Sequence, residues 1–190
     1  MPDHRERSAP SDWVGRFLPE TPDDHGRKAG WVLDLAAGNG RHTLLARSRG
    51  WQVLAVDRVA EPLAGLGDPG ITVVEADLEA GDPHGALMEA TSGRAFSAVI
   101  VTNYLYRPQL PFLARLLAPQ GRLIYETFMH GNAAFGKPGN PDFLLQPNEL
   151  FEAFAPALSI VAFEQGLVEA PAPRMIQRLC AFNGAPVLPG

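Results

Sequence analysis

Three aspartates in the chain have the chemistry and the placement to bind a polar ligand. Asp34, Asp57 and Asp77 each stand at or near the end of an apolar segment. A carboxylate repels a pyrophosphate, so Asp34 beside a Gly-rich turn favours a ligand that carries positive charge. Asp57 comes about 20 residues after Gly38, a spacing from which an acid accepts hydrogen bonds from two ribose hydroxyls. Each aspartate could instead cap a helix, but three segments ending alike favour ligand contact.

The Gly-rich turn, Ala36 to Gly40, separates an apolar segment from a helical one. Small residues let the backbone approach a ligand, and the N–H groups at the start of the next helix can donate to it. The dinucleotide-binding pattern also needs Gly or Ala three residues after its second glycine, where Thr43 stands here. The turn therefore disfavours a nicotinamide dinucleotide, although a nicotinamide-dependent oxidoreductase stays open as an alternative.

Alternating strands and helices must position these residues. The expected strands cover residues 31–36, 52–57, 71–76, 98–102 and 122–125. They are rich in Val, Ile and Leu, which is typical of parallel strands buried on both faces and joined by right-handed crossovers. Two later strand-like segments, 158–163 and 175–182, predict an antiparallel hairpin. We therefore expect an α/β fold with a doubly wound, mostly parallel sheet, helices on both faces and a C-terminal hairpin.

The length of 190 residues, without an internal repeat or linker, predicts a single domain over residues 1–190. Residues 1–11 are polar and contain proline, so they are expected to form a loose N-terminal tail before a short helix at residues 12–18. Residues 128–148 break the strand and helix rhythm after the fifth expected strand. Because this segment is too long for an ordinary connection, we interpret it as a lid-like insertion.

Charge and apolar content limit the classes of partner. A net charge of -5 without any Lys/Arg block makes a nucleic-acid partner unlikely and argues against a membrane surface. The single cysteine, Cys180, lies in an apolar run and is expected to be a buried hydrophobe. No apolar run approaches membrane-spanning length and the first residues lack a signal-peptide core, so we expect a cytoplasmic protein. The oligomeric state stays open.

From about residue 30 to 127 the chain resembles the class I S-adenosylmethionine-dependent methyltransferases. The resemblance rests on the turn after Asp34, on Asp57 and Asp77, and on residues 116–123. That last segment, Leu-Leu-Ala-Pro-Gln-Gly-Arg-Leu, is similar to the family's leucine-rich helix, Pro-Gly turn and fifth strand. The resemblance implies a seven-stranded Rossmann-like sheet in which the hairpin supplies the last two strands.

The chain departs from the family pattern at two positions. Ala36 and Gln120 stand where the family commonly has glycine. Alanine is small enough to leave cofactor binding plausible. The turn Gly40-Arg41-His42 and the chain length are similar to small bacterial methyltransferases related to the tellurite-resistance group.

The resemblance implies S-adenosyl-L-methionine as the cofactor. The Gly-rich turn would hold its methionine end, Asp57 its ribose hydroxyls, and Asp77 with Leu78 its adenine. No metal ion is required, because the sulfonium leaving group is already activated. The cofactor-binding residues expected on this basis are Asp34, Ala36, Gly38, Asn39, Gly40, Asp57, Arg58, Asp77, Leu78 and Asn103.

Residues after the fourth and fifth expected strands are candidates for the acceptor side. If a general base is used, Tyr104 is the first candidate, followed by Glu126 and His130. Arg107 could bind an acidic acceptor through its planar fork, or form a surface ion pair. The sequence thus predicts methyl transfer to a small-molecule acceptor. A non-catalytic S-adenosylmethionine-binding domain stays open as a second alternative.

Overall fold

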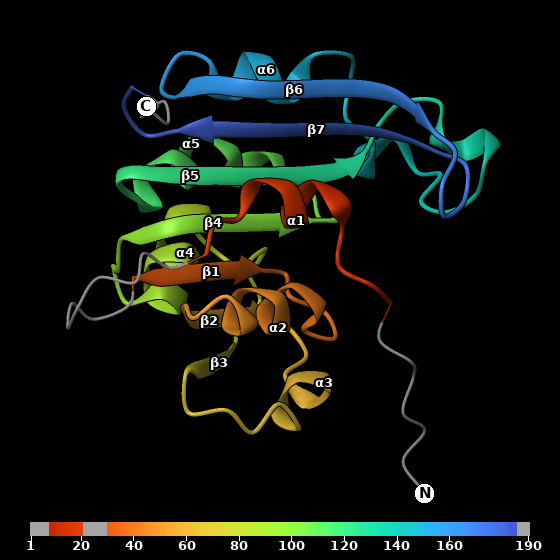
Figure 1. Ribbon diagram of the computed structural model, residues 1–190. Helices are drawn as coiled ribbons and strands as arrows, with labels where there is room; N and C mark the ends of the chain where they lie inside the picture. The colour runs from red at the N-terminus through yellow and green to blue at the C-terminus, as the bar shows by residue number, and fades with distance from the viewer. Residues whose placement is uncertain (1–7, 21–29, 186–190) are drawn as a thin grey trace, which may run out of the picture.

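A seven-stranded sheet forms the centre of the computed structural model, which describes residues 8–20 and 30–185 (Figure 1). The strand order β3-β2-β1-β4-β5-β7-β6, with β1 to β5 parallel and β6 and β7 antiparallel, confirms the expected doubly wound fold and its C-terminal hairpin. The strands are, in chain order, β1 (Trp31–Leu35), β2 (Gln52–Asp57), β3 (Ile71–Glu75), β4 (Phe96–Thr102), β5 (Leu117–Phe128), β6 (Ser159–Val168) and β7 (Arg174–Phe182).

Short helices cover both faces of the sheet, as the sequence predicts (Figure 1). Side chains alternate along β1, so Val32 packs with Trp13 and Ala46 on one face, while Leu33 packs with Leu87 on the other. One face carries α1 (Asp12–Phe17), α2 (Arg41–Ser48) and α3 (Glu61–Ala64), and the other carries α4 (Pro83–Thr91), α5 (Leu110–Leu113) and α6 (Glu149–Phe154).

Helix α1 is fixed to the sheet at its start and along its buried side. The Ser11 hydroxyl caps it by accepting from the Trp13 N–H, and the Trp13 indole donates to the Leu179 carbonyl at 3.2 Å. The sequence predicts a loose N-terminal tail over residues 1–11. Residues 1–7 of this tail lie outside the described residues. Residues 8–11 contact α2, because Arg41 donates to the Ser8 hydroxyl and the Ser11 N–H donates to His42.

Strand β5 differs from its expected boundaries, since it begins at Leu117 rather than at residue 122. The Pro-Gln-Gly turn lies inside the strand, where its pairing with β4 is irregular. Gln120 has a positive φ of 62°, and a Cβ at Gly121 would lie 2.7 Å from the Phe96 carbonyl oxygen. The expected leucine-rich helix is instead three short turns, η1 (Arg107–Gln109), α5 and η2 (Ala114–Leu116), because prolines interrupt the segment.

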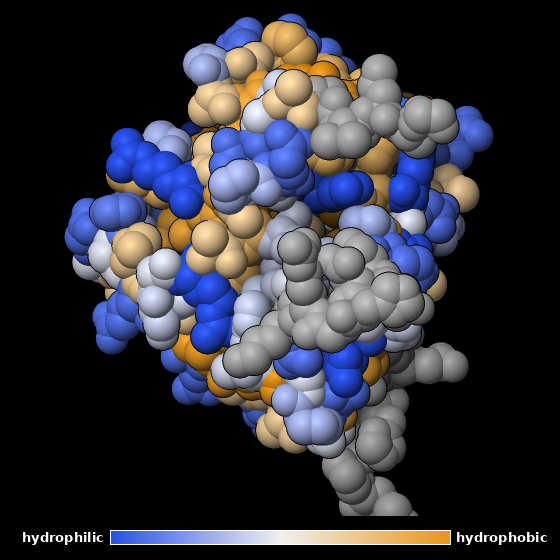
Figure 2. Space-filling view, turned by 60° about the vertical axis from the view of Figure 1, so that its left-hand side comes forward, coloured by the Kyte–Doolittle hydropathy of each residue, from blue (hydrophilic) through white to orange (hydrophobic). Residues whose placement is uncertain are grey.

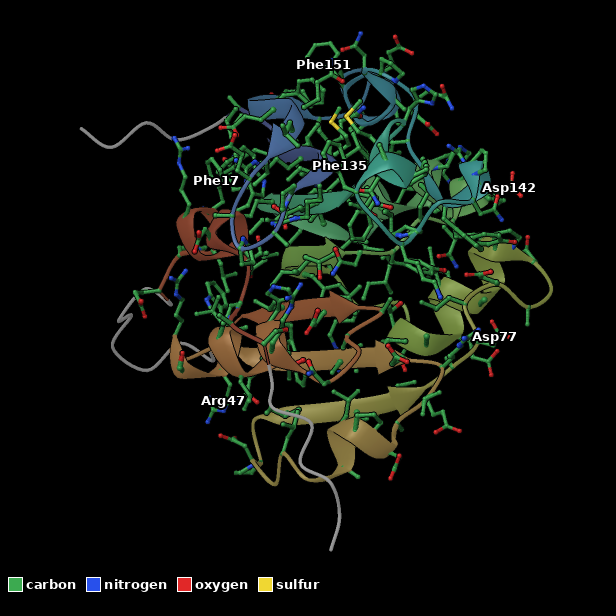
Figure 3. All side chains as sticks on the ribbon, turned by 90° about the vertical axis from the view of Figure 1, so that its right-hand side faces the viewer. Phe17, Arg47, Asp77, Phe135, Asp142 and Phe151 are labelled. Atoms are coloured by element: carbon green, nitrogen blue, oxygen red, sulfur yellow. The ribbon has the colours of Figure 1, made fainter. Side chains whose placement is uncertain are left out.

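The parallel strands all end at one edge of the sheet, which we call the carboxyl edge. In Figure 3, Asp77 and Asp142 lie on the same side of the molecule. The segment after β5 lies here and contains two short turns, η3 (Asn132–Ala134) and η4 (Pro141–Phe143). The opposite edge presents interleaved hydrophilic and apolar residues (Figure 2). Within the described ranges, no helix is both long and apolar enough to cross a bilayer.

Candidate active site

A cavity of about 820 Å³ opens at the carboxyl edge, across the point where the strand order reverses between β1 and β4. Open α/β sheets bind their ligands at such a reversal, and the volume is typical of small-molecule sites. The cavity is lined by Ala36, Asp57, Arg58, Ala76, Asp77, Leu78, Glu79, Asn103, Tyr104, Leu105, Thr127, Phe128, Lys137, Pro138, Gly139, Asn140 and Phe143.

The Asp57 carboxylate joins the end of β2 to the Gly-rich turn after β1. Its Oδ2 accepts from the Gly38 N–H at 2.8 Å, and its Oδ1 accepts from the Val59 N–H at 3.0 Å. An ionised carboxylate offers about four acceptor positions, so each oxygen keeps one for a ligand hydroxyl. Asp57 lines the cavity and therefore meets the geometry expected of a ribose-binding acid.

The Gly-rich turn uses left-handed backbone conformations at three positions. Ala36, Gly38 and Gly40 have φ values of 55°, 58° and 79°. A Cβ at Gly38 would meet open space, whereas a Cβ at Gly40 would lie 2.9 Å from Leu63. Gly38 thus leaves room over the turn, and Gly40 permits close packing of α2 against α3. Of the predicted turn residues, only Ala36 is part of the cavity lining.

Replacing Ala36 with glycine is expected to stabilise the protein by about 0.5–1 kcal/mol, because a left-handed φ costs alanine more than glycine. The thermal unfolding midpoint should rise by about 1–4 °C. Ala37→Gly is the matched control, since Ala37 is buried and has no positive φ. That variant should lower the midpoint. An equal fall in both variants would show that Ala36 is not strained.

Asp34 is buried beneath the turn and does not line the cavity. Its Oδ2 accepts from the Thr43 hydroxyl at 2.6 Å. Burial raises the pKa of Asp34 to about 7, and the Thr43 hydrogen bond only partly opposes the shift. Asp34 is therefore expected to titrate near neutral pH, and it contacts α2 through Thr43 rather than the cavity.

Asp77 and Leu78 follow β3 and line the end of the cavity nearest β2. The Asp77 Oδ1 accepts from the Glu79 N–H at 3.0 Å, which leaves its second oxygen without that hydrogen bond. Leu78 is buried, and Gln109 holds its carbonyl oxygen through a hydrogen bond of 2.6 Å. An apolar side chain beside a carboxylate suits a planar base with an amino group.

Asn103 and Tyr104 follow β4 and line the centre of the cavity. The Asn103 N–H donates to the Glu126 carbonyl, and the Tyr125 hydroxyl donates to the Tyr104 carbonyl, so β5 fixes this segment. The Tyr104 hydroxyl is buried and has no hydrogen-bond partner among the described residues. Burial, reinforced by the nearby Glu79 carboxylate, raises the pKa of Tyr104 above its usual range. A phenol that stays protonated favours a donor role over the general-base role expected from the sequence.

The other two expected bases, Glu126 and His130, are not part of the cavity lining. Glu126 is buried on the α1 side of β5, where its Oε2 lies 3.5 Å from the Arg178 guanidinium. That guanidinium also lies over the ring of Trp13, 4.8 Å from its centre. His130 is exposed, and its backbone N–H donates to the Leu145 carbonyl. The structure thus brings only Tyr104 of the three to the cavity.

Arg107 anchors the segment that follows β5. Its guanidinium forms two hydrogen bonds with the Glu149 carboxylate, at 2.6 and 3.0 Å, and donates to the Asp142 and Leu144 carbonyls. These bonds join η1 to η4 and to the start of α6. Of the two roles that the sequence leaves open for Arg107, the structure shows the ion pair, which is formed with Glu149. This ion pair holds the cavity wall.

Replacing Arg107 with alanine should release this wall. Four hydrogen bonds, two of them to a charged acceptor, predict a loss of about 2–3 kcal/mol and a midpoint about 5–10 °C lower. Protease should then cleave between residues 137 and 147 faster. Arg107→Lys keeps the charge without the planar fork and should lie between wild type and the alanine variant. Unchanged proteolysis in both variants would contradict the anchoring role.

Several lining residues were not predicted from the sequence. Glu79 follows Asp77 directly, but nothing in its local sequence separates it from a solvated acid. Lys137, Asn140 and Phe143 belong to the insertion that the sequence identifies only as a whole. The insertion lies at the carboxyl edge, where Arg107 donates to the carbonyls of Asp142 and Leu144 on either side of Phe143.

Solved structures share this fold. An S-adenosylmethionine-dependent methyltransferase from Mesorhizobium loti superposes with a TM-score of 0.65 at 17% identity, over 89% of this chain and 95% of the other. TehB from Haemophilus influenzae gives a TM-score of 0.65 at 16% identity over 91% of this chain. This chain spans only 60% of TehB.

A third solved structure contains ligands. It is the 1,6-didemethyltoxoflavin-N1-methyltransferase of Burkholderia thailandensis, with 1,6-didemethyltoxoflavin and S-adenosylhomocysteine bound. Its TM-score is 0.58 at 22% identity, over 83% of this chain and 72% of the other. No protein-family model and no curated protein sequence matches this chain.

The chain has the Rossmann-like fold of the class I S-adenosylmethionine-dependent methyltransferases, with the antiparallel β7 between β5 and β6. At the level of fold, the resemblance found in the sequence is confirmed. Neither a nicotinamide-dependent oxidoreductase nor a non-catalytic binding domain finds support in these comparisons.

Proposed function

We propose that the protein is an S-adenosyl-L-methionine-dependent methyltransferase that acts on a small-molecule acceptor. The observation that carries the proposal is the Asp57 carboxylate, which lines a cavity at the strand reversal and keeps acceptor positions on both oxygens. In this fold that arrangement suits a ribose with two free hydroxyls. The open space over Gly38 suits the close approach of a cofactor to the turn.

The remaining lining residues fit the same cofactor. Leu78 and Asp77 would contact the adenine, one through its apolar surface and the other through its carboxylate. The turn from Ala36 to Gly40, of which Ala36 lines the cavity, would hold the methionine end. Arg58 and Asn103 also line the cavity and would complete the cofactor contacts.

When bound, S-adenosylmethionine supplies an activated methyl group for in-line transfer to a nucleophile. The residues of the chain then need to orient the acceptor and exclude water. The Tyr104 hydroxyl, which lacks a partner among the described residues, would donate a hydrogen bond to a bound molecule. Residues 128–148 would form a fixed lid that keeps water from the reacting atoms.

Small molecules suit the cavity better than a polymer does. It is bounded by the strand ends on one side and by residues 137–143 on the other. The acidic net charge gives no support to a nucleic-acid partner. A solved structure with this fold holds a small heterocyclic molecule, 1,6-didemethyltoxoflavin, together with S-adenosylhomocysteine.

Calorimetric titration tests the proposal directly. Purified protein is titrated with S-adenosylmethionine, S-adenosylhomocysteine and NADH, and its fold is checked by circular dichroism. We expect saturable binding of the two sulfur compounds and none of NADH. Binding of NADH instead, or no binding of either sulfur compound by folded protein, would overturn the proposal.

A further inference from the structure

Charge is distributed unevenly around the cavity. The lining at the ends of β2 and β3 contains three carboxylates, Asp57, Asp77 and Glu79, together with Arg58. On the opposite wall, which comes from residues 127–143, Lys137 is the single charged residue among those that line the cavity. We call this wall, defined by its lining residues within 127–143, the acceptor wall. It lies beyond the half of the cavity that suits the cofactor.

Among the residues that the structure describes, no carboxylate forms an ion pair with the Lys137 ammonium. No hydrogen bond or ion pair joins it to another described residue, whereas the Arg107 guanidinium, which contacts the insertion from η1, is engaged by Glu149 and by the Asp142 and Leu144 carbonyls. An ammonium on the wall of a ligand cavity attracts anions, and the attraction strengthens when a ligand displaces water.

The acceptor wall also presents apolar surface. Phe143 is 50% exposed although it lines the cavity, and Phe128 and Pro138 are partly exposed beside it. A ring that covers Phe143 would remove apolar area from water and could stack against it. The wall thus combines one positive charge with exposed aromatic surface.

The wall is held in place rather than free to swing. The Asn132 amide donates to the Pro138 carbonyl at 3.0 Å, directly after Lys137. Arg107 holds the carbonyls of Asp142 and Leu144 on either side of Phe143. A charge and a ring on a fixed backbone select a ligand by the separation of its own charge and ring.

From these observations we infer that the methyl acceptor is a small aromatic molecule with an anionic group such as a carboxylate. Lys137 binds the anionic group and Phe143 covers the aromatic ring. This inference rests on the proposed function, because it places the acceptor beside the cofactor half of the cavity.

Matched pairs of probes that differ only in charge test the inference. Protein saturated with S-adenosylhomocysteine is titrated with benzoate and benzamide, 4-hydroxybenzoate and 4-hydroxybenzamide, and indole-3-acetate and indole-3-acetamide. We expect at least one carboxylate to bind about tenfold tighter than its amide. The preference should vanish in Lys137→Gln and return in Lys137→Arg. Arg115→Gln removes the same charge from an exposed site outside the lining and should keep the preference.

The outcomes separate this inference from the proposed function. If S-adenosylhomocysteine binds but no carboxylate is preferred, or if Lys137→Gln leaves the preference intact, the acceptor class is overturned and the cofactor assignment stands. If S-adenosylhomocysteine itself fails to bind folded protein, the proposed function falls first and the acceptor inference falls with it.

Discussion

Replacing Asp57 with alanine will weaken S-adenosylhomocysteine binding by about 10²- to 10⁴-fold. Two ribose hydroxyls would each donate to a charged acceptor, and such hydrogen bonds contribute about 1.5–3 kcal/mol apiece. The same substitution also frees the Gly38 N–H, which loosens the Gly-rich turn. Isothermal titration calorimetry of the wild type and the variant measures the effect.

The control for Asp57→Ala is Glu89→Ala. Glu89 is exposed on α4 and is not part of the cavity lining, so its removal changes the net charge equally without touching the site. Its affinity for S-adenosylhomocysteine should equal that of the wild type. If folded Asp57→Ala binds within about threefold of the wild type, Asp57 does not hold the ribose.

We expect the free energy of unfolding of the Asp34→Asn variant to rise relative to that of the wild type as the pH is raised from 4 to 8. The pKa of Asp34 is about 7 in the folded protein because of burial, against an ordinary value of 3.8. A raised pKa contributes stability that is complete below pH 3.8 and is lost as pH rises through 7. Asparagine cannot ionise, so the advantage of the variant should grow to the order of 4 kcal/mol.

The contribution of His42 to stability changes with pH in the opposite direction, so it must be separated from the contribution of Asp34. Its ring accepts from the Ser11 N–H and contacts Thr102 Oγ1, and burial lowers the pKa of His42 to about 3. This contribution is present above pH 6.5 and is lost as pH falls toward 3. Because both proteins contain His42, the difference between their free energies of unfolding isolates Asp34. Urea unfolding at pH 4, 6 and 8 measures it, and a difference independent of pH would contradict a raised Asp34 pKa.

Most of the fold could be predicted because buried parallel strands have a continuous apolar sequence. β1, β2 and β3 begin and end within a residue or two of the expected positions. The start of β5 could not be predicted, since Pro119 to Gly121 has the sequence of a turn and the strand continues through it as an irregularity. That outcome depends on pairing with β4, which local sequence does not report.

The cavity residues that follow β2 were easier to predict than those of the acceptor wall. Asp57 stands at a fixed spacing after the Gly-rich turn, so its position follows from the order of the elements. In the sequence, Thr43 indicated only that the turn departs from the dinucleotide-binding pattern. Its hydrogen bond to Asp34 could not be predicted, because it forms only when α2 packs on β1. Lys137 and Phe143 lie in an aperiodic segment, where residue type alone cannot tell which side chains face the cavity.

A crystal structure of the protein with S-adenosylhomocysteine would show whether this cavity binds the cofactor through Asp57. We expect the ribose hydroxyls within hydrogen-bond distance of the Asp57 carboxylate, the adenine against Leu78, and space left along the acceptor wall. Clear density for the ligand at another place on the molecule, or for its ribose turned away from Asp57, would contradict the assignment of this cavity.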